Sequence, residues 1–136
     1  MAKAKIVEPA RVKPFVCDES YSSKLLMDDF VAGAAAININ EGTLKGGGST
    51  GAGVHEQNEL YYAVKGEAVL YLDDEPHELK PGTVVFIPGG VKHALDNKSE
   101  TEDFVLLTMW EKADYNGVHH ARVKAWGTSF KTVDEG

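Results

Sequence analysis

The feature that most constrains this chain is a series of short β-type runs, separated by turn residues, that begins at residue 34. Helix signals are scarce, and no internal repeat is visible along the sequence. Short strands at this spacing are typical of an all-β sandwich or barrel. The expected strands are residues 34–44, 59–64, 67–72, 76–79, 84–87 and 104–110.

Turn residues mark the ends of these runs. Lys65-Gly66 separates two of them, Asp73-Asp74 supplies a tight turn, and Pro88-Gly89-Gly90 breaks a strongly β-branched run. We interpret residues 59–79 as a β-meander. Within the first run, residues 36–40 alternate apolar and polar side chains, as a half-buried strand does.

Size and composition fit one globular domain. The chain has 136 residues, 43% of them hydrophobic and 26% charged, so it can bury a core without disulfides. Its net charge of −7 opposes binding to phosphate backbones and anionic lipid surfaces. We therefore expect no nucleic-acid partner and no membrane partner.

The cysteine and the apolar stretches favour a cytoplasmic location. The single cysteine, Cys17, cannot form an internal disulfide, and no base near it in the sequence would make it a nucleophile. The apolar stretch at residues 30–37 is far shorter than the ~20 residues of a membrane span. The N-terminus is not followed by an apolar signal core.

The chain divides into three expected parts. Residues 1–33 form an extended N-terminal arm and a first edge strand, residues 34–112 form the barrel, and residues 113–136 form a C-terminal extension. Trp126 and Phe130 of the extension are available to pack on the barrel or on a partner. Exposed edge strands and the arm lead us to expect a homodimer.

Residues 55–61 and a histidine further along the chain carry the candidate chemistry. In an extended segment His55, Gln57, Glu59 and Tyr61 point to one face, because strand side chains alternate. A carboxylate at Glu59, next to an apolar run, needs a cation or hydrogen bonds to compensate it. An antiparallel partner strand could bring His93 beside His55 and Glu59.

Two segments of the chain resemble the two motifs of the cupin superfamily. The segment 82–97 matches the second motif at Gly82, Pro88, Gly90, His93 and Asn97. The segment 47–66 is similar to the first motif, at Gly47, His55, Glu59 and Gly66. One ligand position differs from the first motif, because Gly53 occupies the position where the family usually has its first histidine.

The resemblance covers about residues 34–110 and is to small single-domain cupins, the cupin 2 type of conserved barrel. It implies a double-stranded β-helix, or jelly-roll, barrel with metal ligands on its inner strands. The implied ligands are His55, Glu59 and His93. The alternative for His55 and Glu59 is a hydrogen-bonded interior pair without metal, and metal binding is the favoured interpretation.

The implied metal is a divalent transition ion. Two histidines and one carboxylate are the set of Fe(II) facial triads, but zinc, nickel or manganese also fit, and the loss of a ligand at Gly53 also fits an empty site. We expect Gln57 to hydrogen-bond substrate or solvent rather than the metal. Tyr61 is a candidate proton donor, although a buried tyrosine more often simply fills a barrel.

The leading hypothesis is a metal-dependent cupin enzyme acting on a small oxygen-rich organic substrate, of oxygenase, isomerase, lyase or decarboxylase type. The alternative is a non-catalytic barrel that binds a sugar or a carboxylate, and a structural dimer module is a third possibility. Fold alone does not select a reaction. We expect surface positions for His77 and for His119-His120, and a flexible loop at the pocket rim over residues 46–53.

Overall fold

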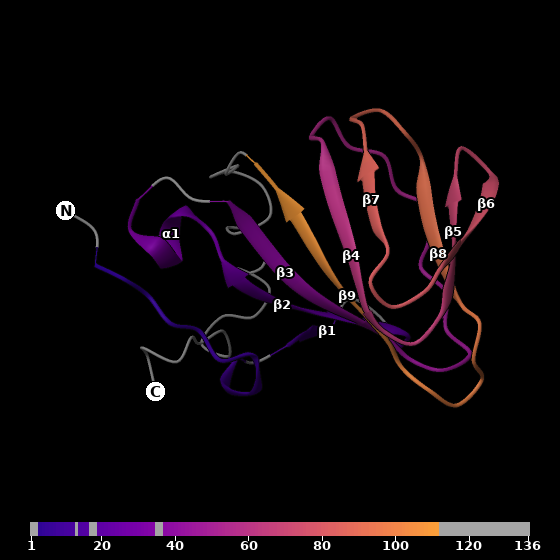
Figure 1. Cartoon of the computed structure of the whole chain (residues 1–136), viewed down its shortest axis with the longest axis horizontal. Coiled ribbons are helices and arrows are strands. Elements are labelled where there is room, and N and C mark those ends of the chain that lie inside the picture. The colour runs from indigo at the N-terminus through magenta and orange to yellow at the C-terminus, as the bar shows by residue number, and fades with distance from the viewer. Residues whose placement is uncertain (1–2, 13, 17–18, 35–36, 112–136) are drawn as a thin grey trace.

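The computed structural model describes residues 3–12, 14–16, 19–34 and 37–111. Antiparallel strands are the main regular structure of this part of the chain, which confirms the expected all-β fold (Figure 1). No helix among the described residues is long and apolar enough to cross a membrane. The elements in chain order are η1 (Pro9–Arg11), β1 (Phe15–Val16), β2 (Tyr21–Met27), α1 (Asp29–Ala32), β3 (Asn38–Leu44), β4 (Glu59–Lys65), β5 (Ala68–Leu72), β6 (Glu75–Leu79), β7 (Val84–Ile87), β8 (His93–Asn97) and β9 (Phe104–Trp110).

The strands form two facing sheets. The larger has six strands in the order β1-β2-β3-β9-β4-β7, and the smaller has three in the order β6-β5-β8. In Figure 1 the small sheet stands beside the β4 and β7 side of the large one. Side chains from both sheets meet between them, as in a jelly roll. The buried core consists of Leu44, Tyr61, Ala63, Ala68, Leu70, Leu79, Ile87, Leu95, Phe104 and Leu106.

The expected meander is only half right. Strands β5 and β6 form a hairpin whose turn residues, Asp73 and Asp74, both have positive φ, the backbone that a two-residue hairpin turn needs. Strand β4, however, belongs to the other sheet. The chain crosses between the sheets at Gly66, where φ is +81° and a Cβ would lie 2.7 Å from the carbonyl oxygen of Asp103. Glycine is therefore required at this crossing.

Strand β3 turns its polar side chains inward. Asn38 and Asn40 are 1% and 3% exposed, whereas Ile37, just before the strand, is 63% exposed. The alternation seen in the sequence is present, but in the first half of β3 the buried members are the asparagines, and the same face continues with Gly42 and Leu44. A period-two pattern reveals that two faces differ without saying which one meets the core. This inversion places amides inside the barrel and apolar side chains outside it.

The first 33 residues contain more regular structure than an arm. Strands β1 and β2 continue the large sheet beyond β3, and β1 is its edge. Helix α1 is a single turn, capped by the Asp28 side chain, which accepts a hydrogen bond from the Val31 N–H at 2.8 Å. An arm extended throughout is not confirmed, because Pro9–Arg11 form a 3₁₀ turn and Val12 is buried. The C-terminal extension 113–136 lies outside the described residues.

Candidate metal centre

Glu59 is the first residue of β4 and lies opposite Ile87 of β7. Its carboxylate faces the barrel interior, with 14% of the side chain exposed. Burial raises the pKa of Glu59, while the nearby imidazoles of His55 and His93 act to lower it. A carboxylate in such a place is compensated most directly by positive charge.

His93 is the first residue of β8 and is held by the segment that precedes β4. The backbone N–H of each of Gly53 and His93 donates to the carbonyl of the other, at 3.0 Å in both cases. This antiparallel bridge belongs to a longer contact, because Ser49 pairs with Asp96 in the same way. The loop expected to be flexible therefore pairs with β8 and fixes His93 beside the start of β4.

His55 lies in the turn between Gly53 and β4. Its carbonyl accepts a hydrogen bond from the Gly90 N–H at 2.9 Å, which ties this turn to the one before β8. The segment bends at Glu56 and Gln57 instead of staying extended. The expectation that His55, Gln57, Glu59 and Tyr61 share a face through regular alternation is thus wrong for Gln57, whose side chain is exposed.

Both imidazoles are oriented by backbone carbonyls. The Nδ1 atom of His55 lies 2.9 Å from the Gln57 carbonyl oxygen, and Nδ1 of His93 lies 2.9 Å from the Val91 carbonyl oxygen. A carbonyl can only accept, so each Nδ1 carries the proton. Each Nε2 then offers its lone pair toward Glu59 when the ring is neutral. Such a partner on the far ring nitrogen is what a metal-binding histidine usually has.

The three side chains converge on one point. Nε2 of His55 lies 3.3 Å from the Glu59 Oε1 atom, and Nε2 of His93 lies 3.7 Å from the same oxygen. The two imidazole centroids are 4.9 Å apart, and one ligand atom from each residue lies within 4.8 Å of the other two. Two imidazoles and one carboxylate at this spacing fit a divalent transition ion.

Tyr61 and Gln57 occupy different positions relative to this cluster. The Tyr61 ring is buried in the core on the same face of β4 as Glu59, with its centroid 6.2 Å from that of His93. Burial raises the pKa of Tyr61 well above its usual range, and the Glu59 charge raises it further. Tyr61 is therefore a protonated donor at neutral pH. Gln57 meets the cluster through its backbone carbonyl, which holds His55.

A polar row continues from Tyr61 across the large sheet. Tyr61 lies opposite Thr108 of β9, and Thr108 lies opposite Asn40 of β3. The Oδ1 atoms of Asn38 and Asn40 are buried without a hydrogen-bond partner among the described residues. Buried amides are normally satisfied, so these two acceptors call for a donor from outside the described part of the chain. Sequence reasoning missed these residues, and the Ile-Asn alternation was the available signal.

The remaining residues considered in the sequence analysis lie apart from the cluster or outside the described part of the chain. His77 is exposed on β6, as expected of a surface residue. Cys17, His119, His120, Trp126 and Phe130 lie outside the described residues.

Comparisons with known proteins agree with this geometry. The family model described as "Cupin domain" matches residues 40–110, which contain the whole cluster and the polar row from Asn40 to Thr108. An uncharacterized protein of Methanocaldococcus jannaschii is 25% identical over 88 residues, which are 64% of this chain and 70% of that protein.

Two solved structures have similar folds. A predicted oxalate decarboxylase from Thermotoga maritima is 22% identical with a TM-score of 0.70, covering 80% of this chain and all of that one (100%). The polyketide cyclase RemF from Streptomyces resistomycificus is 22% identical with a TM-score of 0.71, covering 94% of this chain and 99% of that one. At these identities the likeness establishes the fold and leaves the reaction to the site.

Proposed function

The chain belongs to the cupin family, and on that premise we propose that it is a metal-dependent enzyme acting on a small, oxygen-rich organic molecule. The observation that carries the proposal is the meeting of His55, Glu59 and His93 inside the barrel, with both imidazoles held by backbone carbonyls. The same cluster without an ion would leave a buried carboxylate compensated only by histidines.

The donor set supports a divalent transition ion such as iron, zinc, nickel or manganese. Nε2 of His55, Nε2 of His93 and a carboxylate oxygen of Glu59 would hold it. A bound ion would polarise an oxygen atom of the substrate. Gly53 leaves room beside this set, because a Cβ there would meet no atom within 4 Å. That open side is where a substrate could reach the centre.

The chain's own residues then orient the substrate. Tyr61 remains protonated and can donate a hydrogen bond to a substrate oxygen, or a proton where the reaction needs one. Thr108 and the amide oxygens of Asn38 and Asn40, which have no partner among the described residues, can accept hydrogen bonds from substrate hydroxyl groups. The buried walls keep bulk water away from these contacts. An oxygen-rich substrate is the class that matches this lining.

A barrel that binds a sugar or carboxylate without turnover is the second candidate. The orphaned amide oxygens of Asn38 and Asn40 favour it, because they would recognise a polyhydroxy ligand equally well without any reaction. A screen of hydroxy acids and sugars separates the two candidates: binding with product formation supports the enzyme, and binding alone supports the second candidate.

The metal content of purified protein tests the shared premise. We expect near-stoichiometric metal in protein purified without chelator, and at least about 100-fold weaker metal affinity in His93→Ala, because one of three ligands is lost. His77→Ala is the matched control, since this exposed histidine is outside the cluster. Equal metal content in wild type and in a folded His93→Ala protein would exclude His93 as a ligand.

A further inference from the structure

The outer surface of the large sheet is apolar over β4 and β7. Strand alternation points Leu60, Tyr62 and Val64 of β4 away from the core, and Val84 and Phe86 of β7 lie beside them. All five are exposed, with Val84 and Phe86 at 61% and 57%. Monomeric proteins rarely leave so many neighbouring apolar side chains uncovered. We call this set, together with Ile37 and Met109, the outer face.

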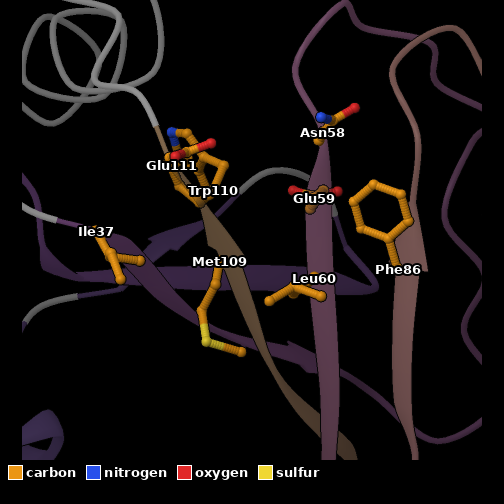
Figure 2. Close-up of a pocket in the computed structure, with 8 residues that line it drawn as sticks. All are labelled: Ile37, Asn58, Glu59, Leu60, Phe86, Met109, Trp110 and Glu111. Carbon is orange, nitrogen blue, oxygen red and sulfur yellow. The ribbon is translucent and has the colours of Figure 1, made fainter.

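A groove of about 300 Å³ crosses the outer face. Figure 2 shows Ile37, Met109, Leu60 and Phe86 lying in turn across it. The sheet register explains this row, because Leu60 lies opposite both Phe86 and Met109. Most of the groove is on the opposite side of β4 from Tyr61, but its lining includes Glu59 of the candidate metal centre, at the start of β4.

The described chain ends at this groove. Trp110 and Glu111 form part of its lining, and Glu111 is the last described residue (Figure 2). Twenty-five residues follow, from Lys112 to Gly136. An extended chain advances about 3.3 Å per residue, so fewer than ten residues suffice to cross a four-strand face whose strands are about 4.8 Å apart. The following segment can therefore reach any part of the outer face.

The chemistry of that segment suits the outer face. Its apolar side chains include Val118, Val123, Trp126 and Phe130. It carries four Lys and Arg against three Asp and Glu, whereas residues 1–111 carry 10 against 18. Opposite net charge favours its contact with the rest of the chain. A second copy, by contrast, would bring two chains of net charge −7 together and place the Glu111 carboxylates of both at one interface.

We propose that residues 112–136 of the same chain cover the outer face, with Trp126 and Phe130 as the apolar anchors in and beside the groove. The contact is intramolecular and excludes both solvent and a second copy from Leu60 and Phe86. The covered groove borders Glu59 at the start of β4, while His55 and His93 are not among its lining residues.

Photo-crosslinking of the full chain tests the proposal. Phe86→p-benzoylphenylalanine places a photoreactive group on the outer face, and Tyr62→p-benzoylphenylalanine is a second variant in case the first fails to fold. Val54→p-benzoylphenylalanine is the control, because Val54 is 61% exposed but lies in the loop before β4. Each protein is irradiated as an equal mixture of ¹⁴N- and ¹⁵N-labelled chains and mapped by mass spectrometry.

We expect the outer-face variants to give crosslinks to peptides within 112–136. Both peptides of each crosslink should carry the same nitrogen isotope, and the crosslinked protein should run at the mass of a monomer on a denaturing gel. The control should give none. Crosslinks of mixed isotope would show that another copy occupies the face and would overturn the proposal. Crosslinks confined to residues 1–111, or no crosslinks from folded outer-face variants, would overturn it as well.

Discussion

At the scale of single residues, the candidate metal centre depends on where each side chain is held. His55 and His93 are each fixed through Nδ1 by a carbonyl two residues away, in the turns before β4 and β8. Motif matching in the sequence identified both histidines and Glu59, but not these carbonyls, because backbone positions depend on turn geometry that side-chain patterns do not specify. The prediction that the Gln57 side chain faces the cluster was wrong for the same reason, because a bend replaces the expected extended segment.

The vacant ligand position at Gly53 gives a residue-scale prediction. Gly53 and His93 are directly opposite in an antiparallel bridge, so a side chain at 53 would share the face of the His93 imidazole. No atom of the described residues lies within 4 Å of a Cβ at Gly53 or at Gly51. We expect Gly53→His to tighten metal binding by about tenfold or more, and Gly51→His to leave it unchanged. Competition with a fluorescent chelator measures both, and equal affinities would contradict the geometry.

The raised pKa of Glu59 predicts the pH dependence of stability. Below the ordinary pKa of 4.5 the side chain is neutral whether the chain is folded or unfolded, so wild type and Glu59→Gln should then be equally stable. As pH rises through the raised folded-state pKa, Glu59 of the metal-free wild type ionises inside the barrel. This ionisation lowers the free energy of unfolding, because the exposed carboxyl of the unfolded chain ionises without a burial cost. Glu59→Gln should therefore melt at a higher temperature than metal-free wild type at pH 7.

Glu78→Gln is the control for that comparison. Glu78 is exposed, and Lys98 lowers the pKa of its carboxyl, which is the opposite direction. This substitution should give no stabilisation at pH 7. Melting curves in the presence of chelator measure both variants from pH 4 to pH 8. A lower melting temperature for Glu59→Gln than for metal-free wild type at pH 7 would mean that the carboxylate stabilises the empty site.

At the scale of strands and turns, the sequence predicted most elements but not how they pair. The runs at 84–87 and 104–110 became β7 and β9 with the expected bounds. Local patterns could not reveal that β4 and β5 belong to different sheets, because strand pairing is set by long-range contacts. Nor could alternation tell that Asn38 and Asn40 face inward. Both misses come from tertiary structure.

The crossing at Gly66 gives the prediction at this scale. Gly66 and Gly82 have similar positive φ, +81° and +91°, but only at Gly66 would a Cβ press on backbone, that of Asp103 and Phe104. We expect Gly82→Ala to lower the free energy of unfolding by about 1–2 kcal/mol, the cost of left-handed backbone. Gly66→Ala should cost at least about 1 kcal/mol more, because the backbone at the start of β9 must move away from the new side chain.

Urea denaturation of the metal-free proteins measures this difference. The comparison cancels the backbone penalty that the two substitutions share, and leaves the contact with the β9 end of the large sheet. Equal losses for the two variants would mean that the crossing has room for a side chain.

At the scale of the whole molecule, sequence reasoning identified an all-β barrel in which one interior carries the chemistry. It did not anticipate that the opposite side of the same strands would be apolar, because a half-buried strand normally exposes polar side chains. Strands β4 and β7 are apolar on both faces, and such strands indicate that something covers the outside. In our account that cover is the C-terminal segment of the same chain.

The homodimer expected from the sequence stays a prediction. With the outer face covered, association would use the exposed edge of β1, where Val16 lies, so we expect Phe86→Lys to leave the dimer intact. Sedimentation velocity of wild type and variant checks this. A wild-type species of 14.7 kDa would contradict the dimer, and a dimer lost only in Phe86→Lys would place the interface on the outer face instead.

A crystal structure of metal-loaded protein tests most directly whether the cluster binds metal, with anomalous diffraction recorded on both sides of the absorption edge of the metal. We expect a single anomalous peak between Nε2 of His55, Nε2 of His93 and the Glu59 carboxylate, at about 2.0–2.2 Å from each. Both Nδ1 atoms should still face their carbonyls. A peak elsewhere on the chain, or none at this cluster with metal in excess, would contradict the claim that His55, Glu59 and His93 form a metal centre.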